Sequence, residues 1–325
     1  MKSPWLKIVS FALLGLASMP TATAQSPYPV KTVRLITAVP VGADIYVRTL
    51  GTRLGELLGQ PVVVENKIGG AQSLAVQFVA NAPPDGHTLL IQSVAALISK
   101  IVNPKREFDP VGDFAAVAKI YGNGASALVV RGDSAVRNIE DLVSQAKASP
   151  GKLSYGATER GSLSHLATEL FIFATNIQVF HVPFKTPNDY LQAMLRGDVD
   201  FAIAATTQSM SQLKAGKMRA LGVTSAARIR DLPDIPALRE RLKNDLLIQE
   251  NWAGLAVPLK TPVEIVRRLN AETIKALTDL GVRKTIEAAG NDPAAAETPE
   301  QYAAFVRREN DKWREIVKVT GVKPD

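Results

Sequence analysis

Short apolar runs rich in β-branched residues alternate with amphipathic segments along most of the chain. Residues 33–36 are typical of a strand, whereas residues 44–58 carry apolar side chains at helical spacing. By these criteria, strands are expected over residues 33–36, 61–64, 88–92, 116–120, 127–130, 153–156, 177–181, 199–204, 219–223 and 252–257. Helices are expected over residues 44–58, 73–80, 139–148, 162–174, 188–195, 210–213, 262–280, 282–289 and 299–319. This alternation predicts an α/β protein with mostly parallel sheets.

The length of the chain predicts two lobes. With 325 residues, the protein exceeds what one compact core usually holds. No internal repeat and no low-complexity linker divides the sequence. We therefore expect interleaved lobes, in which the chain crosses into a second lobe and later returns. The Gly122-Asn123-Gly124 segment between two expected strands indicates a turn at the first crossing.

The first 24 residues have the features of a secretory signal peptide. Lys2 and Lys7 precede and flank a mostly apolar run over residues 8–17, and Ala22-Thr23-Ala24 forms a small-residue cleavage site. The alternative is a membrane anchor, which would need about 20 apolar residues to span the bilayer. We therefore expect cleavage before Gln25 and export to a bacterial periplasm.

The composition excludes several kinds of chemistry. Cysteine is absent, which excludes disulfides, thiolate catalysis and cysteine-ligated metals. His87, His165 and His181 lack the spacing of a zinc motif, and no glycine pattern matches a nucleotide-binding motif. We therefore expect neither a metal nor a cofactor. The net charge of +7 is spread along the chain, so nucleic acid is not an expected partner.

Two loops between an expected strand and an expected helix are candidate anion sites, because free N–H groups at a helix start favour negative charge. The first contains Val41, Gly42, Ala43 and Asp44. The alternative for this loop is an ordinary strand-to-helix connection in which Asp44 caps the helix.

The second candidate loop follows Tyr155. It contributes Thr158, Glu159, Arg160, Gly161, Ser162 and Ser164. Its hydroxyl groups can donate hydrogen bonds, its glycine permits close approach of a ligand, and Arg160 can pair with a carboxylate. The alternative is that Ser162 only caps the helix and Arg160 points to solvent.

Weaker candidates occur where other expected strands end. Ser93 follows one strand, Lys185 and Thr186 precede a helix, and Ala204 and Ala205 end a buried strand. Ligand sites of α/β proteins form at such strand ends. The alternative for each is an ordinary strand end or helix cap.

A catalytic function has little support in the residues. Ser164 and His165 are adjacent, but neighbouring residues on a helix point about 100° apart and do not form a nucleophile–base pair. No nucleophile elbow of the G-x-S-x-G type is present. We expect no catalytic residues, and we expect His165 and His181 to be structural. An exported hydrolase using Ser164 or Asp44 is the alternative.

Several motifs follow one another in a recognisable order. They are Pro61-Val-Val-Val-Glu-Asn66, Pro84-Asp-Gly-His-Thr-Leu-Leu90, Phe108-Asp-Pro-Val-Gly-Asp-Phe114, residues 154–166, His181-Val-Pro-Phe-Lys185, Gly197-Asp-Val-Asp200, residues 213–225 and Thr261-Pro-Val-Glu-Ile-Val266. Together they resemble the tripartite tricarboxylate transporter receptors, the Bug-type extracytoplasmic solute-binding proteins.

This resemblance implies a two-lobed, Venus-flytrap fold of the periplasmic-binding-protein type (type II-like) with interleaved lobes. Lobe one is expected over residues 25–124 and 226–325, and lobe two over residues 125–225. The resemblance further implies that a monomer binds a small carboxylate between the lobes through the two loops described above. Family members deliver their ligand to a membrane permease with large and small subunits, and some instead serve sensing systems.

The chain also departs from the pattern of the family. The loop at residues 41–44 is shorter and has one glycine, and the second loop contains Glu159-Arg160 where small polar residues are usual. Thr186 replaces the glycine of a Tyr-Lys-Gly motif, and Ala204-Ala205 replaces a strand end that is often acidic. These departures predict a ligand that differs from the common dicarboxylates of the family.

Overall fold

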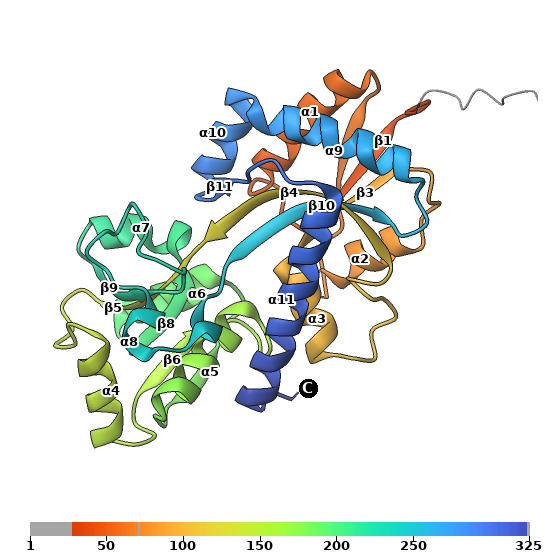
Figure 1. Cartoon of the computed structure of the whole chain (residues 1–325). Coiled ribbons are helices and arrows are strands. Elements are labelled where there is room, and N and C mark those ends of the chain that lie inside the picture. The colour runs from red at the N-terminus through yellow and green to blue at the C-terminus, as the bar shows by residue number, and fades with distance from the viewer. Residues whose placement is uncertain (1–27, 71, 324–325) are drawn as a thin grey trace, which may run out of the picture.

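The computed structural model describes residues 28–70 and 72–323, so the expected signal peptide lies outside the described residues. Two lobes, each built on one β-sheet, lie side by side (Figure 1). The first sheet has the order β11-β4-β10-β3-β1-β2. Its strands are β1 (Val33–Thr37), β2 (Val62–Asn66), β3 (Thr88–Ser93), β4 (Phe114–Gly124), β10 (Asn251–Pro258) and β11 (Asp292–Pro293).

The second sheet has the order β7-β6-β8-β5-β9. Its strands are β5 (Ser126–Arg131), β6 (Ser154–Ala157), β7 (Phe180–Pro183), β8 (Phe201–Ala205) and β9 (Met218–Val223). Each sheet is parallel on one side and antiparallel where β4, β10, β5 and β9 join it. The expectation of mostly parallel sheets is therefore corrected to mixed sheets, because the strands that cross between lobes run antiparallel to their neighbours.

Helices cover the faces of both sheets. Those that follow the strands of the first lobe are α1 (Ile45–Leu58), α2 (Ser73–Ala80) and α3 (Val94–Val102). Those of the second lobe are α4 (Ile139–Ala148), α5 (Leu163–Thr175), α6 (Pro187–Arg196), α7 (Thr206–Lys214), α8 (Leu238–Leu242) and the 3₁₀ helix η1 (Asp245–Leu247). The chain ends with α9 (Val263–Thr278), α10 (Leu280–Ala288) and α11 (Pro299–Thr320). The sequence pattern did not predict α3, α8 or η1, and it predicted only residues 210–213 of α7.

The first crossing between the lobes lies at Ala125. β4 ends at Gly124 in the first sheet, and β5 begins at Ser126 in the second. The Gly122-Asn123-Gly124 segment is not a turn, as expected from the sequence, but the end of β4, where Gly122 pairs with Asp292 and Gly124 with Asn251.

The return crossing lies later than residues 225–226. After β9 the chain stays with the second lobe: Val223 donates its N–H to the carbonyl of Pro236 at 2.9 Å, and Leu238 and Leu247 are buried in the same apolar cluster as Leu221. The chain next enters the first sheet with β10. We therefore propose that lobe two extends from residue 125 to about residue 250, rather than to residue 225.

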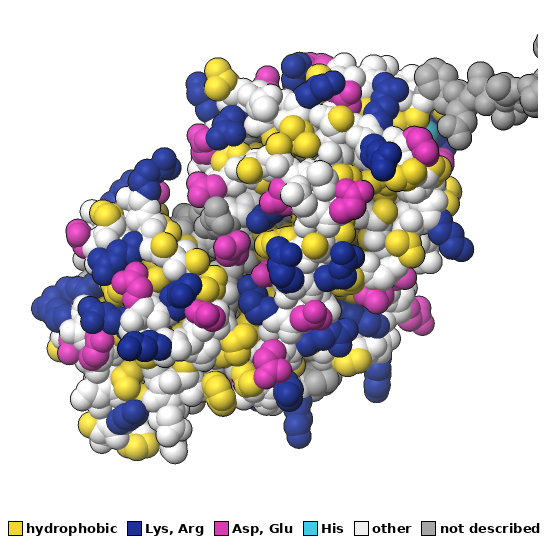
Figure 2. All heavy atoms as spheres, in the orientation of Figure 1, with side chains coloured by type: hydrophobic (Ala, Val, Ile, Leu, Met, Phe, Trp, Pro, Cys, Tyr) yellow, Lys and Arg dark blue, Asp and Glu magenta, His cyan; other side chains and the backbone are white. Residues whose placement is uncertain are grey.

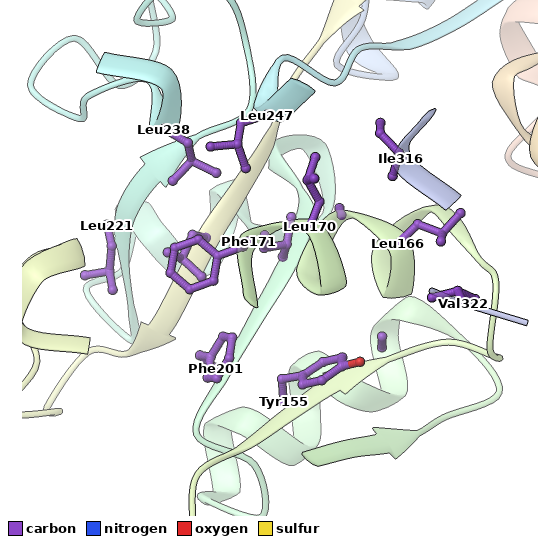
Figure 3. Packing of buried hydrophobic residues seen from close by; sticks show 14 of the residues in the cluster. Tyr155, Leu166, Leu170, Phe171, Phe201, Leu221, Leu238, Leu247, Ile316 and Val322 are labelled. Atoms are coloured by element: carbon purple, nitrogen blue, oxygen red, sulfur yellow. The ribbon is translucent and has the colours of Figure 1, made fainter. Parts of the chain in front are cut away.

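The C-terminal helix α11 joins the two lobes. Near its start, Tyr302 is fully buried and lies edge to face with Trp252 of β10, with the ring centroids 6.2 Å apart. Near its end, Ile316 and Val322 pack into the cluster that contains Leu166 of α5 (Figure 3). This apolar core is therefore continuous between the lobes on the side of α11.

The surface of the described residues carries mixed charges. On the face shown in Figure 2, Lys and Arg side chains are interspersed with Asp and Glu rather than gathered in one block. Within the described ranges, no helix combines the length and apolar character needed to cross a bilayer.

Candidate ligand-binding site

A cavity of about 430 Å³ lies between the two lobes. One wall comes from the first lobe, with Gly70, Ala95, Ile98, Ser99, Val102, Asn103 and Arg106, and the other from the second lobe, with Glu159, Arg160, Gly161, Ser162 and Leu163. Cavities that hold small ligands usually measure about 300–1,000 Å³ and combine apolar walls with a few polar groups. The cavity has this character, and four residues of the expected second loop line it.

The N-terminus of α5 shapes this second loop. Ser162 is the N-cap residue, and its hydroxyl accepts the backbone N–H of His165 at 3.2 Å. Ser164 accepts the backbone N–H of Thr158 at 3.2 Å, so this serine holds the loop in shape. Ser162 therefore caps its helix and also lines the cavity, so the capping and ligand-facing positions that the sequence left as alternatives occur together. Thr158 and Ser164 do not line the cavity.

Gly161 brings the second loop against the first lobe. Its φ of +78° lies in the left-handed region that favours glycine, and a methyl group in its place would lie 2.7 Å from Cγ1 of Val102. The backbone N–H of Gly161 points the other way, toward His165, and donates to its Nδ1 at 3.4 Å. Only glycine meets both the backbone and the space requirements of this contact.

The rings of His165 and His181 pack next to the second loop. The ring of His181 stacks on Tyr155 with the centroids 5.0 Å apart and meets His165 at 4.6 Å. Burial lowers the pKa of His165 to about 4, and the neighbouring His181 and Arg160 act in the same direction. Burial likewise lowers the pKa of His181. Both rings are therefore neutral near pH 7 and serve packing, as expected from the sequence.

A smaller cavity of about 130 Å³ adjoins the first, because Ala95 and Leu163 line both. Its polar groups come from the first lobe, and one of them is Ser93 at the end of β3, which caps α3 and accepts the backbone N–H of Ala95 at 3.3 Å. The Ser93 hydroxyl also donates to Oε1 of Gln72 at 2.9 Å. Tyr46 and Tyr121, whose rings meet edge to face at 5.6 Å, complete the wall.

In the first expected loop, the side chain of Asp44 is held by contacts within its own lobe. Asp44 is only 1% exposed, and its carboxylate accepts hydrogen bonds from Asn66 at 2.8 Å and from the backbone N–H of Gly42 at 3.1 Å. It also pairs with Arg48 at 2.7 Å. Burial alone would raise the pKa of Asp44, but these donors outweigh it and lower the pKa. The carboxylate is thus fully used within the lobe, and Asp44 makes no side-chain cap to α1.

The other residues of this loop also lie off the two cavities. Val41, Gly42 and Ala43 are exposed, and they line neither cavity. Instead Thr37, Ala38 and Val39, which precede them, line the smaller cavity. In this part of the first lobe, the lining of the smaller cavity therefore comes from the end of β1 and the two residues after it rather than from residues 41–44.

The remaining weak candidates, Ser93 apart, serve local structure. Thr186 caps α6 in a capping box with Asp189, and Lys185 beside it is exposed. Ala204 pairs with Ala127 inside the second sheet, and Ala205 pairs with Ser126 directly before α7. None of these four lines either cavity.

Sequence reasoning missed several residues that line the cavities, of which Gln72 and Arg106 are the most polar. Gln72 adopts φ +72° directly before α2, and Arg106 donates from Nη1 to the carbonyl of Gly70 at 2.8 Å. The signal was present in Gly69-Gly70, a glycine pair between a strand and a helix. Such a pair indicates a loop that a ligand can approach closely, as argued above for the second loop.

The described residues offer little for catalysis or metal binding. Ser164 and His165 bond to separate backbone groups and not to each other, so they form no nucleophile–base pair. Within the described ranges, no group of three or more His, Asp or Glu side chains is placed to hold a metal ion. The chemistry of the site is therefore that of hydrogen-bond donation and guanidinium charge.

Solved structures of similar chains share this architecture. The periplasmic binding protein BugD is 26% identical, with a TM-score of 0.76 over 92% of this chain and 100% of that one. A protein of R. palustris solved with adipate is 29% identical, with a TM-score of 0.78 over the same shares. MatC from Rhodopseudomonas palustris with bound malate is 28% identical, with a TM-score of 0.75 over 89% of this chain and 100% of that one. The two-lobed periplasmic-binding-protein fold is thereby confirmed.

Comparisons of the amino-acid sequence identify the family of this chain. A protein of Cupriavidus necator encoded in the gbd 5' region is 31% identical over 96% of this chain and 94% of its own length. Protein BugT of Bordetella pertussis is 28% identical over 95% of each chain. The profile of the Tripartite tricarboxylate transporter family receptor matches residues 46–322. That family consists of solute-binding receptors and not of enzymes. This chain therefore belongs to the tripartite tricarboxylate transporter receptor family.

Proposed function

We propose that this protein is a periplasmic receptor that captures a small organic carboxylate between its lobes and delivers it to a tripartite tricarboxylate-type permease. The observation that carries the proposal is the pair of adjoining cavities, lined by hydroxyl, amide and guanidinium groups of both lobes. Similar proteins solved with adipate and with malate support the ligand class.

Donors of two kinds can hold a carboxylate in these cavities. Gln72 supplies its amide NH₂ group, which Ser93 orients by donating its hydroxyl proton to Oε1, and the N-terminus of α5 adds free N–H groups near Ser162. A hydrogen bond to a charged group is worth about 1.5–3 kcal/mol, and a helix N-terminus about 0.3–1 kcal/mol or more when partly buried. Two or three such contacts suffice for micromolar affinity, about −8 kcal/mol.

Export is part of the same proposal. The basic start, the apolar run and the small-residue cleavage site of residues 1–24 support removal of a signal peptide before Gln25. Periplasmic relatives such as BugD support the same location. Mass spectrometry of the protein from a periplasmic fraction should show a chain that begins at Gln25, and an intact Met1 there would contradict export.

A thermal-shift screen of carboxylates tests the binding proposal. A ligand that binds only the folded protein stabilises it by about 2.7 kcal/mol at a hundredfold excess over Kd. Hits are measured by calorimetry on the mature protein and on Ser93→Ala, with Ser134→Ala of the second lobe as a control remote from both cavities. We expect weaker binding in the first variant only. Absence of binding by every carboxylate in the screen would overturn the proposal.

Delivery needs its own measurement. Cells that carry the receptor and the candidate permease should accumulate the labelled ligand, and cells that carry Ser93→Ala should accumulate less at limiting concentration. A ligand that binds tightly but is never accumulated would separate binding from transport and would argue against the permease as the partner.

A further inference from the structure

The larger cavity has one apolar side and one charged side. Ala95, Ile98, Val102 and Leu163 form the apolar side, of which Ala95 and Leu163 also line the smaller cavity. The charged residues are Arg106 of the first lobe with Glu159 and Arg160 of the second. A molecule that extends from the smaller cavity into the larger one therefore passes apolar side chains before it meets guanidinium groups.

Arg106 retains free hydrogen-bonding capacity at the cavity. Its Nη1 donates to the carbonyl of Gly70 at 2.8 Å, which fixes one corner of the guanidinium. Its Nε is buried and has no hydrogen-bond partner among the described residues. Because Nε is buried, a ligand in the cavity would meet the Nη groups, of which only Nη1 has a hydrogen bond to another described residue.

Arg160 faces the same cavity from the opposite lobe. Among residues 28–70 and 72–323, neither Arg106 nor Arg160 lies within 4.0 Å of a carboxylate oxygen, although many other arginines of the chain do. Arg160 is exposed on its loop, and its charge contributes to lowering the pKa of His165, after burial and the neighbouring His181. Both guanidiniums are thus available to an anion in the cavity.

The charge of the lining matches one additional acidic group. Two guanidiniums and the carboxylate of Glu159 leave a single positive charge in excess. The smaller cavity is lined by hydroxyl, amide and apolar groups and by no charged side chain of the described residues. One carboxylate can therefore bind at Ser93 and Gln72, while a second acidic group neutralises the excess charge of the larger cavity.

We propose that the receptor is selective for elongated dianions, whose second acidic group is bound jointly by Arg106 of lobe one and Arg160 of lobe two. This inference rests on the proposed function as a carboxylate receptor. The apolar stretch between the two ends favours a ligand with a hydrocarbon spacer over a short hydroxy acid. Because the two guanidiniums belong to different lobes, the second acidic group also favours the closed arrangement by removing their mutual repulsion.

Calorimetry with matched ligand pairs tests the proposal. The probes are succinate, glutarate, adipate and pimelate, each compared with the straight-chain monocarboxylate of the same length. For the wild type we expect the longer dicarboxylates to bind at least about tenfold more tightly than the monocarboxylates of the same length. A tenfold difference in Kd corresponds to the free energy of about one charge-assisted hydrogen bond. Arg106→Gln and Arg160→Gln should each weaken adipate binding about tenfold or more while changing hexanoate binding less than about threefold.

Several controls isolate the charge effect. Lys105→Gln removes one positive charge at an exposed position next to Arg106, and Lys152→Gln does the same at an exposed position of lobe two. Neither variant should change the affinity for adipate or for hexanoate. If Arg106→Gln only loosened the loop at Gly70, adipate and hexanoate would weaken together. The double variant should lose less adipate affinity than the product of the two single losses, because both arginines bind one group.

The outcomes separate the two proposals. If carboxylates bind but the arginine variants affect adipate and hexanoate equally, or affect neither, the dianion proposal fails and the receptor function stands. If no mono- or dicarboxylate binds the wild type, the receptor function fails and this inference fails with it. Selective loss of the longer dicarboxylates in both arginine variants supports the proposal.

Discussion

The side-chain hydroxyl of Thr224 accepts a hydrogen bond from the backbone N–H of Ser126, with 2.9 Å between Oγ1 and N. The same hydroxyl donates to the carbonyl of Gln249 at 2.9 Å. Ser126 begins the strand after the first crossing, and Gln249 lies just before the return crossing at β10. One buried side chain therefore links the two segments at which the chain passes between the lobes.

Removal of this hydroxyl should destabilise the protein without altering the cavities. Thr224→Val keeps the shape of the side chain but leaves the N–H of Ser126 and the carbonyl of Gln249 without this partner. We expect a loss of about 1–3 kcal/mol in the free energy of unfolding, the usual cost of leaving a buried group unpaired. Denaturant titration measures the loss, with Thr224→Ser, which retains the hydroxyl, as the control. Equal stability of Thr224→Val and the wild type would show that the link contributes nothing.

The contact of Gly161 with Val102 predicts how closure can be weakened. Gly161→Ala places a methyl group 2.7 Å from Cγ1 of Val102 and also imposes strain at φ +78°. Strain of this kind costs about 1–2 kcal/mol per residue. We expect the affinity for the best carboxylate of the screen to fall about tenfold, and small-angle scattering to show less compaction on ligand addition.

Gly151 offers a matched control for this substitution. It has φ +69°, but a methyl group there would meet no atom within 4 Å. Gly151→Ala should therefore reproduce the backbone strain without the contact between lobes, and its ligand affinity should equal that of the wild type. Val102→Ala should restore part of the affinity to Gly161→Ala. If both glycine variants lose the same affinity, the contact between the lobes plays no part in binding.

The lowered pKa of His165 predicts an acid-sensitive fold. Its pKa in the folded protein is about 4, against about 6.5 in an unfolded chain. Between these values the unfolded chain binds more protons, so the free energy of unfolding falls as the pH falls from about 6.5 toward about 4. Above about pH 6.5 the group has no effect. His165→Gln removes the titration but can still accept the N–H of Gly161.

Denaturant midpoints measured across this pH range check the prediction. We expect the midpoint of the wild type to fall more steeply than that of His165→Gln. His181, Glu169, Tyr155 and Arg160 surround or influence the ring, and their own responses remain in the variant. Parallel curves for the two proteins would contradict the assignment of the acid response to His165.

Much of the fold was predictable because side-chain periodicity and local caps determine it. Leu50 and Leu54 mark the buried face of α1, and Asn138 caps α4 as expected. Helix α3 was missed because its segment Val94–Val102 is mostly apolar and follows β3 directly, without a turn residue to mark where the strand ends. Its side chains Val94, Leu97 and Ile98 pack in the same apolar cluster as Tyr302 and Ile316 of α11. Those contacts come from the far end of the chain, and no local signal announces them.

The candidate site was predictable only in part, since tertiary contacts decide which strand ends face the cavities. Ser93 and four residues of the loop that contains Arg160 line the cavities, and their role in ligand binding stays a prediction. Asp44 lines neither cavity, and its contact with Asn66 of β2 is one that no local pattern reveals. The glycine pair Gly69-Gly70 indicates a loop that a ligand can approach, but it does not indicate Arg106, which reaches the carbonyl of Gly70 from 36 residues further along the chain.

The buried contacts of Asp44 predict that its substitution affects stability rather than binding. Asp44→Asn keeps the size of the side chain but weakens the bonds from Asn66, Gly42 and Arg48, which now meet a neutral amide. Hydrogen bonds to charged groups are worth about 1.5–3 kcal/mol, so we expect a loss of unfolding free energy of this order. Because the pKa of Asp44 is lowered by these donors, the wild type should lose the same stability as acid protonates the carboxylate, whereas Asp44→Asn should not.

Calorimetry separates this structural role from the ligand role that the sequence suggested. Once the protein is folded, Asp44→Asn should bind the best carboxylate of the screen within about threefold of the wild type, because its side chain lines neither cavity. Val41→Ala, at an exposed position of the same loop, provides a control in which neither stability nor affinity should change. A fall in affinity of more than about tenfold in Asp44→Asn, with unfolding unchanged, would return this residue to the binding site.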